Sequence, residues 1–337
     1  MVYKCINCNS QLIEHIDYLD CEKCKRTYPR ISKVLVFDDE NDRNWSNFYD
    51  DWHENVTKKN IAKGTPRILS KIKKNILIES FKRVGFYHEY RKTAFIKDAL
   101  KKQKSLQILD VGCGKGNPIL SAYGNVYGVD LSMNALLYNN HNFNYTELIK
   151  CNIYTLPFFD NQFDLLVNIF VFGHIEFNKK DELLREFYRV LKPDGQLIMI
   201  VETDNNNFVL RFAKKYPDIY QNRVVMQYGH IGMESVKQTI ERIKNNNFII
   251  IKRNKTWGPL WSINDYIEVF DNEYKDKSVF IRLFIRICKV LKKNRLVEIV
   301  FNALLGLLSM IYDSITKLDN SMGLMIFARK FKAELYE

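Results

Sequence analysis

Between residues 105 and about 255, segments with the pattern of strands alternate with segments with the pattern of helices. Ser105–Asp110, Val126–Val129, Leu165–Phe170 and Gln196–Val201 are short apolar runs of the length that buried strands have. Between the last two lies Asp181–Leu191, a longer stretch of mixed polar and apolar residues that predicts a helix. Strands that alternate with helices in this way predict an α/β domain.

The remainder of the chain has three further parts. Residues 1–40 are rich in cysteine and predict short strands, and residues 41–104 predict helices with aromatic and basic side chains. Residues 256–322 predict a helical insertion, after which Gly323–Lys330 returns as a strand. We therefore expect a small domain over 1–40, a helical lid or linker over 41–104, and an α/β domain over 105–337 that contains the insertion.

Four cysteines near the N-terminus form two CxxC pairs, Cys5 with Cys8 and Cys21 with Cys24. Two such pairs suit a tetrahedral metal site, because each pair offers two thiolates to one ion. A segment of about 40 residues is too short for a sufficient apolar core, so the metal would supply much of its folding energy. We expect a structural Zn²⁺ ribbon with a core separate from that of the α/β domain. An iron site with the same ligands is the alternative.

A glycine-rich loop follows the strand Ser105–Asp110. It reads Val-Gly-Cys-Gly-Lys-Gly over residues 111–116 and leads into Asn-Pro and an expected helix. Glycines at such a turn let a ligand approach the backbone without a clash with Cβ. The spacing is GxGxG and differs from the GxGxxG of dinucleotide binders. The next strand, Val126–Val129, is followed by Asp130, an acid placed to accept hydrogen bonds from ribose hydroxyls.

These motifs resemble a known family. The sequences ILDVGCGKG, GVD, LPFFDNQFDLL, GHI and LLREFYRVLKPDGQLIMI are together similar to the class I S-adenosylmethionine-dependent methyltransferases, close to the UbiE/type-11 group. The resemblance covers residues 105 to about 255 and the last strand, and implies a Rossmann-like sheet with helices on both faces. The cysteine segment, with Val34–Phe37 after it, resembles the Trm112-like zinc ribbon found in front of some bacterial methyltransferases.

The resemblance implies which residues hold the cofactor, S-adenosylmethionine. Asp110 and the loop glycines would line its methionine and ribose side, Asp130 would hold the ribose diol, and Leu131 and Met133 would lie near the adenine. Asn152 stands where the family usually has an aspartate, and its amide oxygen can still accept a hydrogen bond from the adenine amino group. The complete expected set is Asp110, Gly112, Cys113, Gly114, Gly116, Asp130, Leu131, Met133, Asn152, Ile153 and Phe170.

Two histidines are candidates for a catalytic base. The cofactor carries an activated methyl group, so the protein mainly aligns the acceptor and excludes water. A hydroxyl or amide acceptor also needs a base. His174 follows the fourth strand, and His230 lies in a Tyr-Gly-His-Ile stretch; for both, a packed histidine is the alternative. Tyr49 and Trp52 are expected on a helix that covers the cofactor, with plain packing as the alternative.

The C-terminal insertion bears on the choice of substrate. Lys275–Arg295 holds eight Lys or Arg among apolar residues, and Leu296–Tyr312 is an apolar run with one acid, Glu298. This run is too short to span a bilayer comfortably. One interpretation is a helical cap over the site or a dimer contact. The other is a cationic amphipathic helix and an apolar helix over 279–312 that rest on a membrane surface and meet a lipid-linked acceptor.

Composition and charge limit the class of protein, its location and its partners. The chain has 337 residues, of which 46% are hydrophobic and 27% charged, and a formal net charge of +12. These values exclude disordered, collagen-like and disulfide-rich proteins. Without an N-terminal signal or an apolar run of about 20 residues, we expect a cytoplasmic protein, with a membrane-peripheral location as the alternative. Residues 58–104 hold 15 Lys or Arg and three acids, which fits an RNA partner or a solvated helical face.

The expected function is methyl transfer from S-adenosylmethionine to an oxygen or nitrogen of a small-molecule, glycan or natural-product acceptor. The alternatives are an RNA methyltransferase that uses the zinc ribbon and the basic segment, and a methyltransferase for a lipid-linked acceptor at a membrane. The sequence has no NPPY or DPPY motif and no Pro-Cys pair, which argues against base-amino and cytosine C5 chemistry. It leaves the oligomeric state open.

Overall fold

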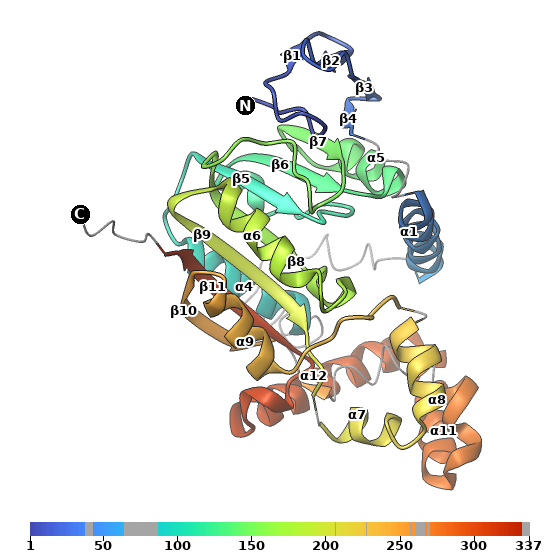
Figure 1. The fold of residues 1–337 in the computed structure, drawn as a ribbon. Coiled ribbons are helices and arrows are strands. Elements are labelled where there is room, and N and C mark those ends of the chain that lie inside the picture. The colour runs from blue at the N-terminus through green and yellow to red at the C-terminus, as the bar shows by residue number, and fades with distance from the viewer. Residues whose placement is uncertain are drawn as a thin grey trace.

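A mixed sheet with helices on both faces forms the centre of the protein (Figure 1). The structure is a computed structural model that describes residues 1–37, 43–63, 87–205, 207–226, 228–256, 258–259, 267 and 270–331. The central strands are β5 (Leu106–Val111), β6 (Gly124–Asp130), β7 (Glu147–Lys150), β8 (Phe163–Ile169), β9 (Leu191–Glu202), β10 (Phe248–Lys255) and β11 (Gly323–Lys330). Their order across the sheet is β7-β6-β5-β8-β9-β11-β10.

The strands from β7 to β9 run parallel, and β11 is antiparallel to both of its neighbours, β9 and β10. In the middle of the sheet Asp110 lies opposite Gly128 of β6 and Val167 of β8. Parallel strands bring their carboxyl ends to one edge, where ligands of open α/β sheets bind. The expected Rossmann-like α/β class is confirmed, and Gly323–Lys330 is a strand as predicted.

Helices cover the sheet on both sides and extend beyond it. They are α1 (Arg43–Lys63), α4 (Tyr87–Leu100), α5 (Met133–Asn142), α6 (Lys180–Val190), α7 (Phe208–Ala213), α8 (Pro217–Ile219), α9 (Val236–Asn245), α11 (Val279–Lys293) and α12 (Arg295–Ile315). Phe187 of α6 and Ile240 of α9 belong to the same buried cluster on one face of the sheet. Ile96 and Leu100 of α4 pack on the opposite face, so the core has two layers.

Short helical turns and π-helical segments complete the connections. The 3₁₀ turns are η2 (Leu120–Ala122), η3 (Phe172–His174), η6 (Lys275–Lys277) and η7 (Leu318–Asn320), and the π-helical segments are η4 (Tyr220–Met226) and η5 (Phe270–Tyr274). The prediction of a helix after the glycine loop is wrong. The chain forms only a single 3₁₀ turn there, η2. The chain between Gly116 and Gly124 is too short for a full helix and a return to the sheet.

The N-terminal segment forms a small antiparallel sheet. Its strands are β1 (Ile13–Glu14), β2 (Tyr18–Asp20), β3 (Thr27–Ile31) and β4 (Val34–Val36). β4 then pairs in parallel with β7, with Val34 opposite Leu148 and Val36 opposite Lys150. The segment therefore extends the central sheet by its β7 edge, which Figure 1 shows at the upper end of the molecule.

The expectation of a separate core for residues 1–40 is wrong. Tyr3, Leu19 and Phe37 belong to the same buried cluster as residues of the central sheet. The Tyr3 ring lies 5.7 Å from that of Phe158, and the Lys4 amide donates to the Pro157 carbonyl at 3.0 Å. Such a small segment cannot bury enough apolar area by itself, so its apolar side chains pack against the core of the central sheet.

Helices α11 and α12 lie between β10 and β11, where the insertion was predicted. Both lie at the opposite end of the molecule from β1–β4 (Figure 1). A small cluster around the buried Ala213 and Tyr274 joins α7 and the π-helical segments to Ile281 of α11. Residues 64–86, the middle of the predicted lid or linker, lie outside the described residues.

Candidate functional site

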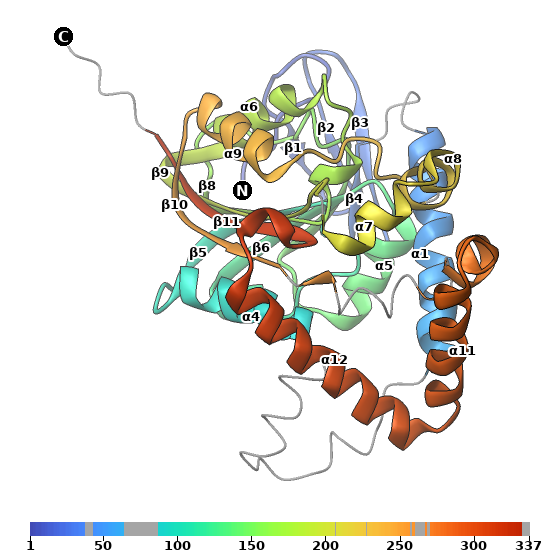
Figure 2. The same cartoon turned by 90° about the horizontal axis from the view of Figure 1, so that it is seen from below.

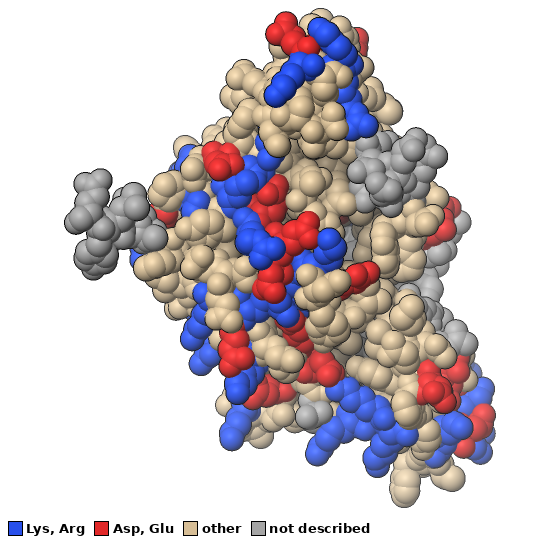
Figure 3. All heavy atoms as spheres, in the orientation of Figure 1, with Lys and Arg blue, Asp and Glu red and all other residues tan. Residues whose placement is uncertain are grey.

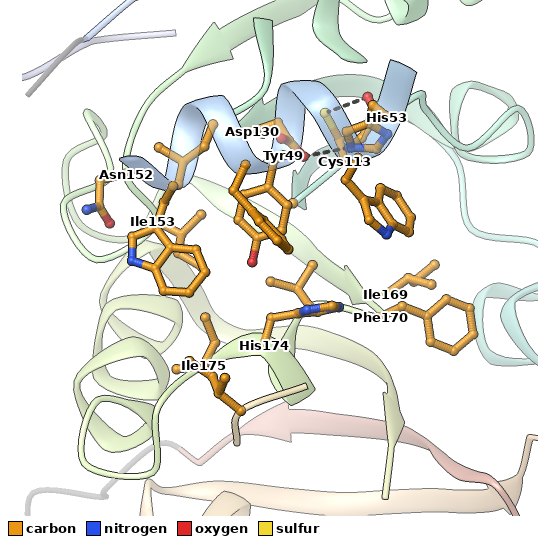
Figure 4. Close-up of a pocket in the computed structure, with 18 of the residues that line it drawn as sticks. Tyr49, His53, Cys113, Asp130, Asn152, Ile153, Ile169, Phe170, His174 and Ile175 are labelled. Carbon is orange, nitrogen blue, oxygen red and sulfur yellow. Dashed lines mark hydrogen bonds between the residues drawn. The ribbon is translucent and has the colours of Figure 1, made fainter. Parts of the chain in front are cut away.

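A cavity of about 530 Å³ lies at the carboxyl edge of β5, β6 and β8. This volume is within the range of sites that bind small molecules and cofactors. Five segments form its walls. They are the glycine loop after β5 with the end of β6, the face of α1, residues 152–154 after β7, the segment from the end of β8 past η3 to Lys179, and residues near Tyr228. Figure 4 shows α1 across one side of the cavity and His174 on the other, with Tyr49 pointing between them.

The glycine loop lines the cavity with backbone. Gly112 has φ +67°, and a Cβ there would lie 2.2 Å from Cγ2 of Val171. Gly114 has φ +48°, and a Cβ there would lie 3.3 Å from Cε1 of His53. Both positions therefore need glycine for its conformation and, at Gly112, for the close approach of the β8 segment. The result is a concave backbone surface that a ligand can contact.

Asp130 at the end of β6 fixes the shape of this loop. Its Oδ2 accepts a hydrogen bond from the Gly114 amide at 2.7 Å, and its Oδ1 accepts one from the Ser132 amide at 2.9 Å. The residue is buried at 8% exposure but contributes to the cavity wall. Burial raises the pKa of Asp130, and these backbone donors oppose the rise by stabilising the carboxylate. The Leu131 amide is a third backbone donor, and a carboxylate has about four acceptor sites, so Asp130 keeps acceptor capacity for a ligand hydroxyl.

Helix α1 covers the cavity with aromatic side chains. Trp45, Phe48, Tyr49 and Trp52 all line the cavity, and their spacing of three, four and seven residues places them on one helical face. They overlap one another in edge and stacked contacts, with ring centroids 5.2–6.1 Å apart between Trp45, Phe48 and Tyr49. This face gives the cavity an apolar, π-rich wall.

Polar contacts attach α1 to the sheet edge. Asp50 Oδ1 accepts hydrogen bonds from the Ser132 hydroxyl at 2.6 Å and from the Asn134 amide at 3.0 Å. The Ser46 hydroxyl donates to the Leu131 carbonyl at 3.1 Å. Because Asp50 bonds the first turn of α5, its charge also interacts favourably with the N-terminal end of that helix. The position of the aromatic face is thus set by the residues that follow Asp130.

His174 lies in η3 on the opposite wall. Its Nδ1 is 3.1 Å from the Gly229 carbonyl, and the backbone of Phe170 also bonds to the ring; both contacts stabilise a ring hydrogen. Burial lowers the pKa of His174 to about 4, so the ring is neutral at pH 7. Its ring centroid lies 4.9 Å from that of His230 and 6.1 Å from that of Tyr49.

Phe170 also lies on this wall, with φ +58°. A left-handed conformation costs a bulky residue of the order of 1–3 kcal/mol and is concentrated at functional sites. Its amide donates to the Ile200 carbonyl at 2.7 Å, which holds the turn after β8 in place. The strained turn directs the Phe170 backbone and ring to the cavity edge.

The cavity brings together most of the predicted site residues. Its lining includes Gly112, Cys113, Gly114, Asp130, Leu131, Asn152, Ile153, Phe170 and His174. The other predicted residues, Asp110, Gly116, Met133 and His230, do not line it. Asn152 uses its amide oxygen locally, where it accepts from the Tyr154 amide at 2.9 Å.

The residues outside the cavity have structural contacts. Asp110 lies behind the loop and accepts a hydrogen bond from the Tyr145 hydroxyl at 2.6 Å, and burial raises its pKa to about 7. Gly116 faces Asn139 and Phe143, to which a Cβ would come within 2.8 Å. Asp110 and Gly116 were predicted from the glycine motif. Residues of this motif can serve the packing of the fold as well as the binding site.

Several lining residues were not predicted. They include Trp45, Phe48, His53, Tyr154, Val171, Ile175, Glu176, Lys179, Tyr228 and Ile231. For α1 a signal existed, because its aromatic residues repeat at helical spacing in the sequence. Tyr154, Glu176 and Lys179 have no such signal. They line the cavity because the segments that follow β7 and β8 lie close together in the folded protein.

The four N-terminal cysteines also meet. Their Sγ atoms all lie within 4.8 Å of one another, with Cys5 and Cys24 at 3.5 Å and Cys8 and Cys21 at 3.4 Å. Among the described residues this is the group of His, Cys, Asp and Glu whose ligand atoms are close enough for a metal ion. The spacing predicted the cluster correctly.

The comparisons with known proteins agree with the fold and the loop. Residues 109–199 match a family model described as a methyltransferase domain. The demethylmenaquinone methyltransferase of Listeria welshimeri is 36% identical over 153 residues, which cover 41% of this chain and 61% of the relative. That of Anoxybacillus flavithermus is 32% identical over 124 residues, which cover 33% of this chain and 52% of the relative. The chain thus spans about half to three-fifths of the length of these curated relatives.

A solved structure is similar over a longer range. Phosphoethanolamine N-methyltransferase 2 of Haemonchus contortus, in complex with S-adenosyl-L-methionine, has 20% sequence identity and a TM-score of 0.46. The match covers 75% of this chain and 56% of that one. The family match confirms the expected methyltransferase domain over 109–199.

The lowered pKa of His174 predicts a pH effect on stability. Between about pH 6.5 and pH 4 the unfolded chain binds a proton at this position and the folded chain does not, so His174 lowers the free energy of unfolding as the pH falls. At pH 5 this lowers the free energy of unfolding by an amount on the order of 2 kcal/mol, and His174→Gln should remove that loss. Urea unfolding at pH 7 and pH 5 measures it.

Wild type and His174→Gln have to be compared with each other. The raised pKa of buried Asp110 increases the free energy of unfolding as the pH falls, and it does so equally in both proteins. His141→Gln, at an exposed position of α5, is the control and should leave the pH dependence as it is. An equal change for wild type and His174→Gln between the two pH values would show that burial does not keep this ring neutral.

Proposed function

We propose that the protein is an S-adenosylmethionine-dependent methyltransferase that acts on a small apolar or aromatic molecule. One observation carries the proposal. The positive-φ glycines and the buried carboxylate of Asp130 meet at the carboxyl edge of the sheet, in a cavity that an aromatic helix covers. The matching family model and the names of the curated relatives support the same activity.

The residues present fit the cofactor. The backbone at Gly112 and Gly114 offers a cradle that side chains would fill, and the Asp130 carboxylate keeps acceptor capacity for a ribose hydroxyl. Leu131 and Ile153 would contact the adenine, with Asn152 beside it. When bound, S-adenosylmethionine supplies a methyl group on a sulfonium, and the protein has to hold the acceptor in line and keep water out. With an acceptor bound, the aromatic face of α1 and the wall at His174 would exclude water.

The cavity wall favours an apolar acceptor. Trp45, Phe48 and Trp52 from α1 face Phe170 and Tyr228 from other segments, and aromatic faces bind flat apolar groups well. Trp45 is 39% exposed and Trp52 is 36% exposed, so a bound molecule would cover apolar area that water now contacts. The relatives' names specify demethylmenaquinone, a small-molecule acceptor.

His174 is the proposed proton acceptor for an acceptor hydroxyl. It lines the cavity and its ring is neutral at pH 7, so one of its two ring nitrogens carries a lone pair that can take a proton. His230 contacts the ring of His174 from outside the cavity lining, so we assign it a positioning role.

For an RNA acceptor, no described contact adds support. Of the basic segment 58–104, Arg91 is bonded to Asp313 and Lys92 to Glu89, and residues 64–86 lie outside the described residues.

We also propose that Cys5, Cys8, Cys21 and Cys24 hold a structural Zn²⁺. At a Zn–S distance of about 2.3 Å, tetrahedral ligand sulfurs are roughly 3.8 Å apart, which fits a group whose members lie within 4.8 Å. Four protein ligands leave no open position for catalysis. Because the cluster shares the core of the sheet, the metal would stabilise the whole domain.

Binding of the product S-adenosylhomocysteine tests the cofactor site. Asp130→Asn should raise its dissociation constant by about tenfold to a hundredfold in calorimetry, because charge-assisted hydrogen bonds are lost. Asp164→Asn is the matched control: Asp164, at the amino end of β8, also accepts from a backbone amide, that of Gln107 at 2.8 Å. Equal affinities for wild type and Asp130→Asn would contradict the assignment of Asp130.

A labelling experiment tests the acceptor class. Incubation with S-adenosylmethionine that carries a tritiated methyl group should label a molecule in the organic extract of cells. Total RNA, offered in parallel, should stay unlabelled. His174→Gln should lower the labelling at least tenfold while the affinity for S-adenosylhomocysteine is kept, because general base catalysis contributes about a hundredfold or more. Label in RNA would overturn the proposed acceptor.

Metal content and unfolding test the zinc site together with the shared core. Elemental analysis should find one zinc per chain. Cys21→Ser should lower that content and shift one cooperative thermal transition of the whole domain, because the two parts share buried residues. Cys288→Ser, a buried cysteine of α11, should keep the zinc. Metal-free wild-type protein with four reactive N-terminal thiols would exclude the site.

A further inference from the structure

Helices α11 and α12 expose an apolar surface that the rest of the described chain does not cover. In α11 the exposed apolar residues are Val279, Phe280, Leu283, Phe284, Ile287 and Val290, and Phe280 is 86% exposed. Contiguous apolar patches of this kind are uncommon on soluble monomers and usually mark an interaction site. In the view of Figure 2 the two helices project from the sheet as an angled pair.

The residues of α11 fall into three arcs. At about 100° per residue, the exposed apolar residues span an arc of roughly 140°. Ile285 and Cys288 form a separate, buried arc that packs toward the protein. Arg282, Arg286 and Lys293 lie in the third arc, directly beside the exposed apolar one. The apolar arc is therefore not the packing face of the helix, and its border is cationic.

Helix α12 has the same division without charges on its outer side. Val300, Leu304, Leu307 and Ile311 are exposed and repeat at helical spacing. The inner side is anchored, because Asp313 is 3% exposed and pairs with Arg91 at 3.0 Å. The Phe208 and Tyr312 rings pack 6.2 Å apart on the same side.

The expectation that the apolar run is too short to span a bilayer is wrong, because the helix extends it: by length and composition Val297–Ile315 could cross a membrane, and 22% of that window is buried in the protein. Crossing would break the buried pair of Arg91 and Asp313, which is costly. The anchored inner side instead favours a helix that lies flat with its outer side in contact with lipid.

The charge of α11 selects the partner. The helix carries five basic residues and no acid. Two of the five pair with acids that precede the helix, Arg282 with Asp276 and Lys289 with Asp271. Figure 3 shows Lys and Arg side chains at this end of the molecule, with Asp and Glu among them. A second copy of the chain on this surface would bring two cationic arcs together, which is unfavourable. An anionic lipid surface satisfies both arcs, because the apolar residues enter the acyl region and the basic residues contact head groups.

We propose that the exposed faces of α11 and α12, here called the α11–α12 surface, dock on an anionic membrane. The surface connects to the cavity. Ile281 of α11 and Tyr228 of the cavity wall pack on the same cluster around Tyr274. Docking would therefore bring the cavity wall near the bilayer, and the acceptor would be an apolar molecule drawn from it. This last step rests on the proposed function, whereas the docking does not.

Vesicle cosedimentation tests the docking. The full chain should bind vesicles of phosphatidylcholine with phosphatidylglycerol and bind vesicles of phosphatidylcholine alone at least tenfold more weakly. Phe280→Ser/Leu283→Ser should lower the binding more than tenfold, because two apolar side chains that docking would bury are lost. Ile16→Ser/Ile31→Ser is the matched control, since Ile16 is 88% exposed and lies at the other end of the molecule. It should bind like wild type.

A charge variant guards against misfolding. Arg286→Glu/Lys293→Glu leaves the apolar residues in place and should lower binding at least fivefold per changed charge, at about 1 kcal/mol each. Both variants should keep wild-type affinity for S-adenosylhomocysteine. If that affinity is absent from wild type while vesicles still bind, the proposed function fails and the docking stands.

Three results would overturn the docking. The first is no binding to anionic vesicles. The second is equal binding by wild type and both variants. The third is a wild-type dimer that Phe280→Ser/Leu283→Ser dissociates, which would assign the surface to a second copy.

Discussion

The buried carboxylate of Asp130 connects the parts of the site. It accepts from the Gly114 amide in the loop after β5 and from the Ser132 amide at the start of α5. The Ser132 hydroxyl donates in turn to Asp50 of α1. A continuous set of hydrogen bonds therefore runs from the sheet edge through the start of α5 to the helix that covers the cavity. The raised pKa of Asp130 reflects the cost of burying this charge, and the backbone donors offset it.

The N-terminal segment depends on the central sheet in a different way. Pairing of β4 with β7 leaves Phe37 beside the end of β7, where its amide donates to the Lys150 carbonyl at 2.8 Å. Asn152 and Ile153 of the cavity wall follow two residues later. The cysteine cluster thus supports the strand edge that leads into the site, although its sulfurs lie outside the cavity lining. A metal there would act on the site through stability.

The sequence predicts the parts of this arrangement that depend on local geometry. The glycine loop needs positive φ at Gly112 and Gly114, and CxxC pairs need close sulfurs, so both leave a mark in the residues themselves. Whether a motif residue faces the ligand or the core depends on packing: Asp110 bonds Tyr145, which is 35 positions away. The sharing of a core between residues 1–40 and the sheet likewise depends on strand pairing. Neither follows from spacing.

In the described part of the chain, the apolar face of α1 and that of α11 and α12 are left uncovered for different reasons. The aromatic face of α1 is held over the cavity by Asp50 and Ser46, so its exposure is built into the site and a ligand is needed to cover it. The outer faces of α11 and α12 are exposed because their inner faces are already used, by Ile285 and Cys288 in one helix and by Asp313 in the other. Exposed apolar area costs free energy in water. A small apolar acceptor and a lipid surface would cover these regions separately, and the cluster around Tyr274 joins the two.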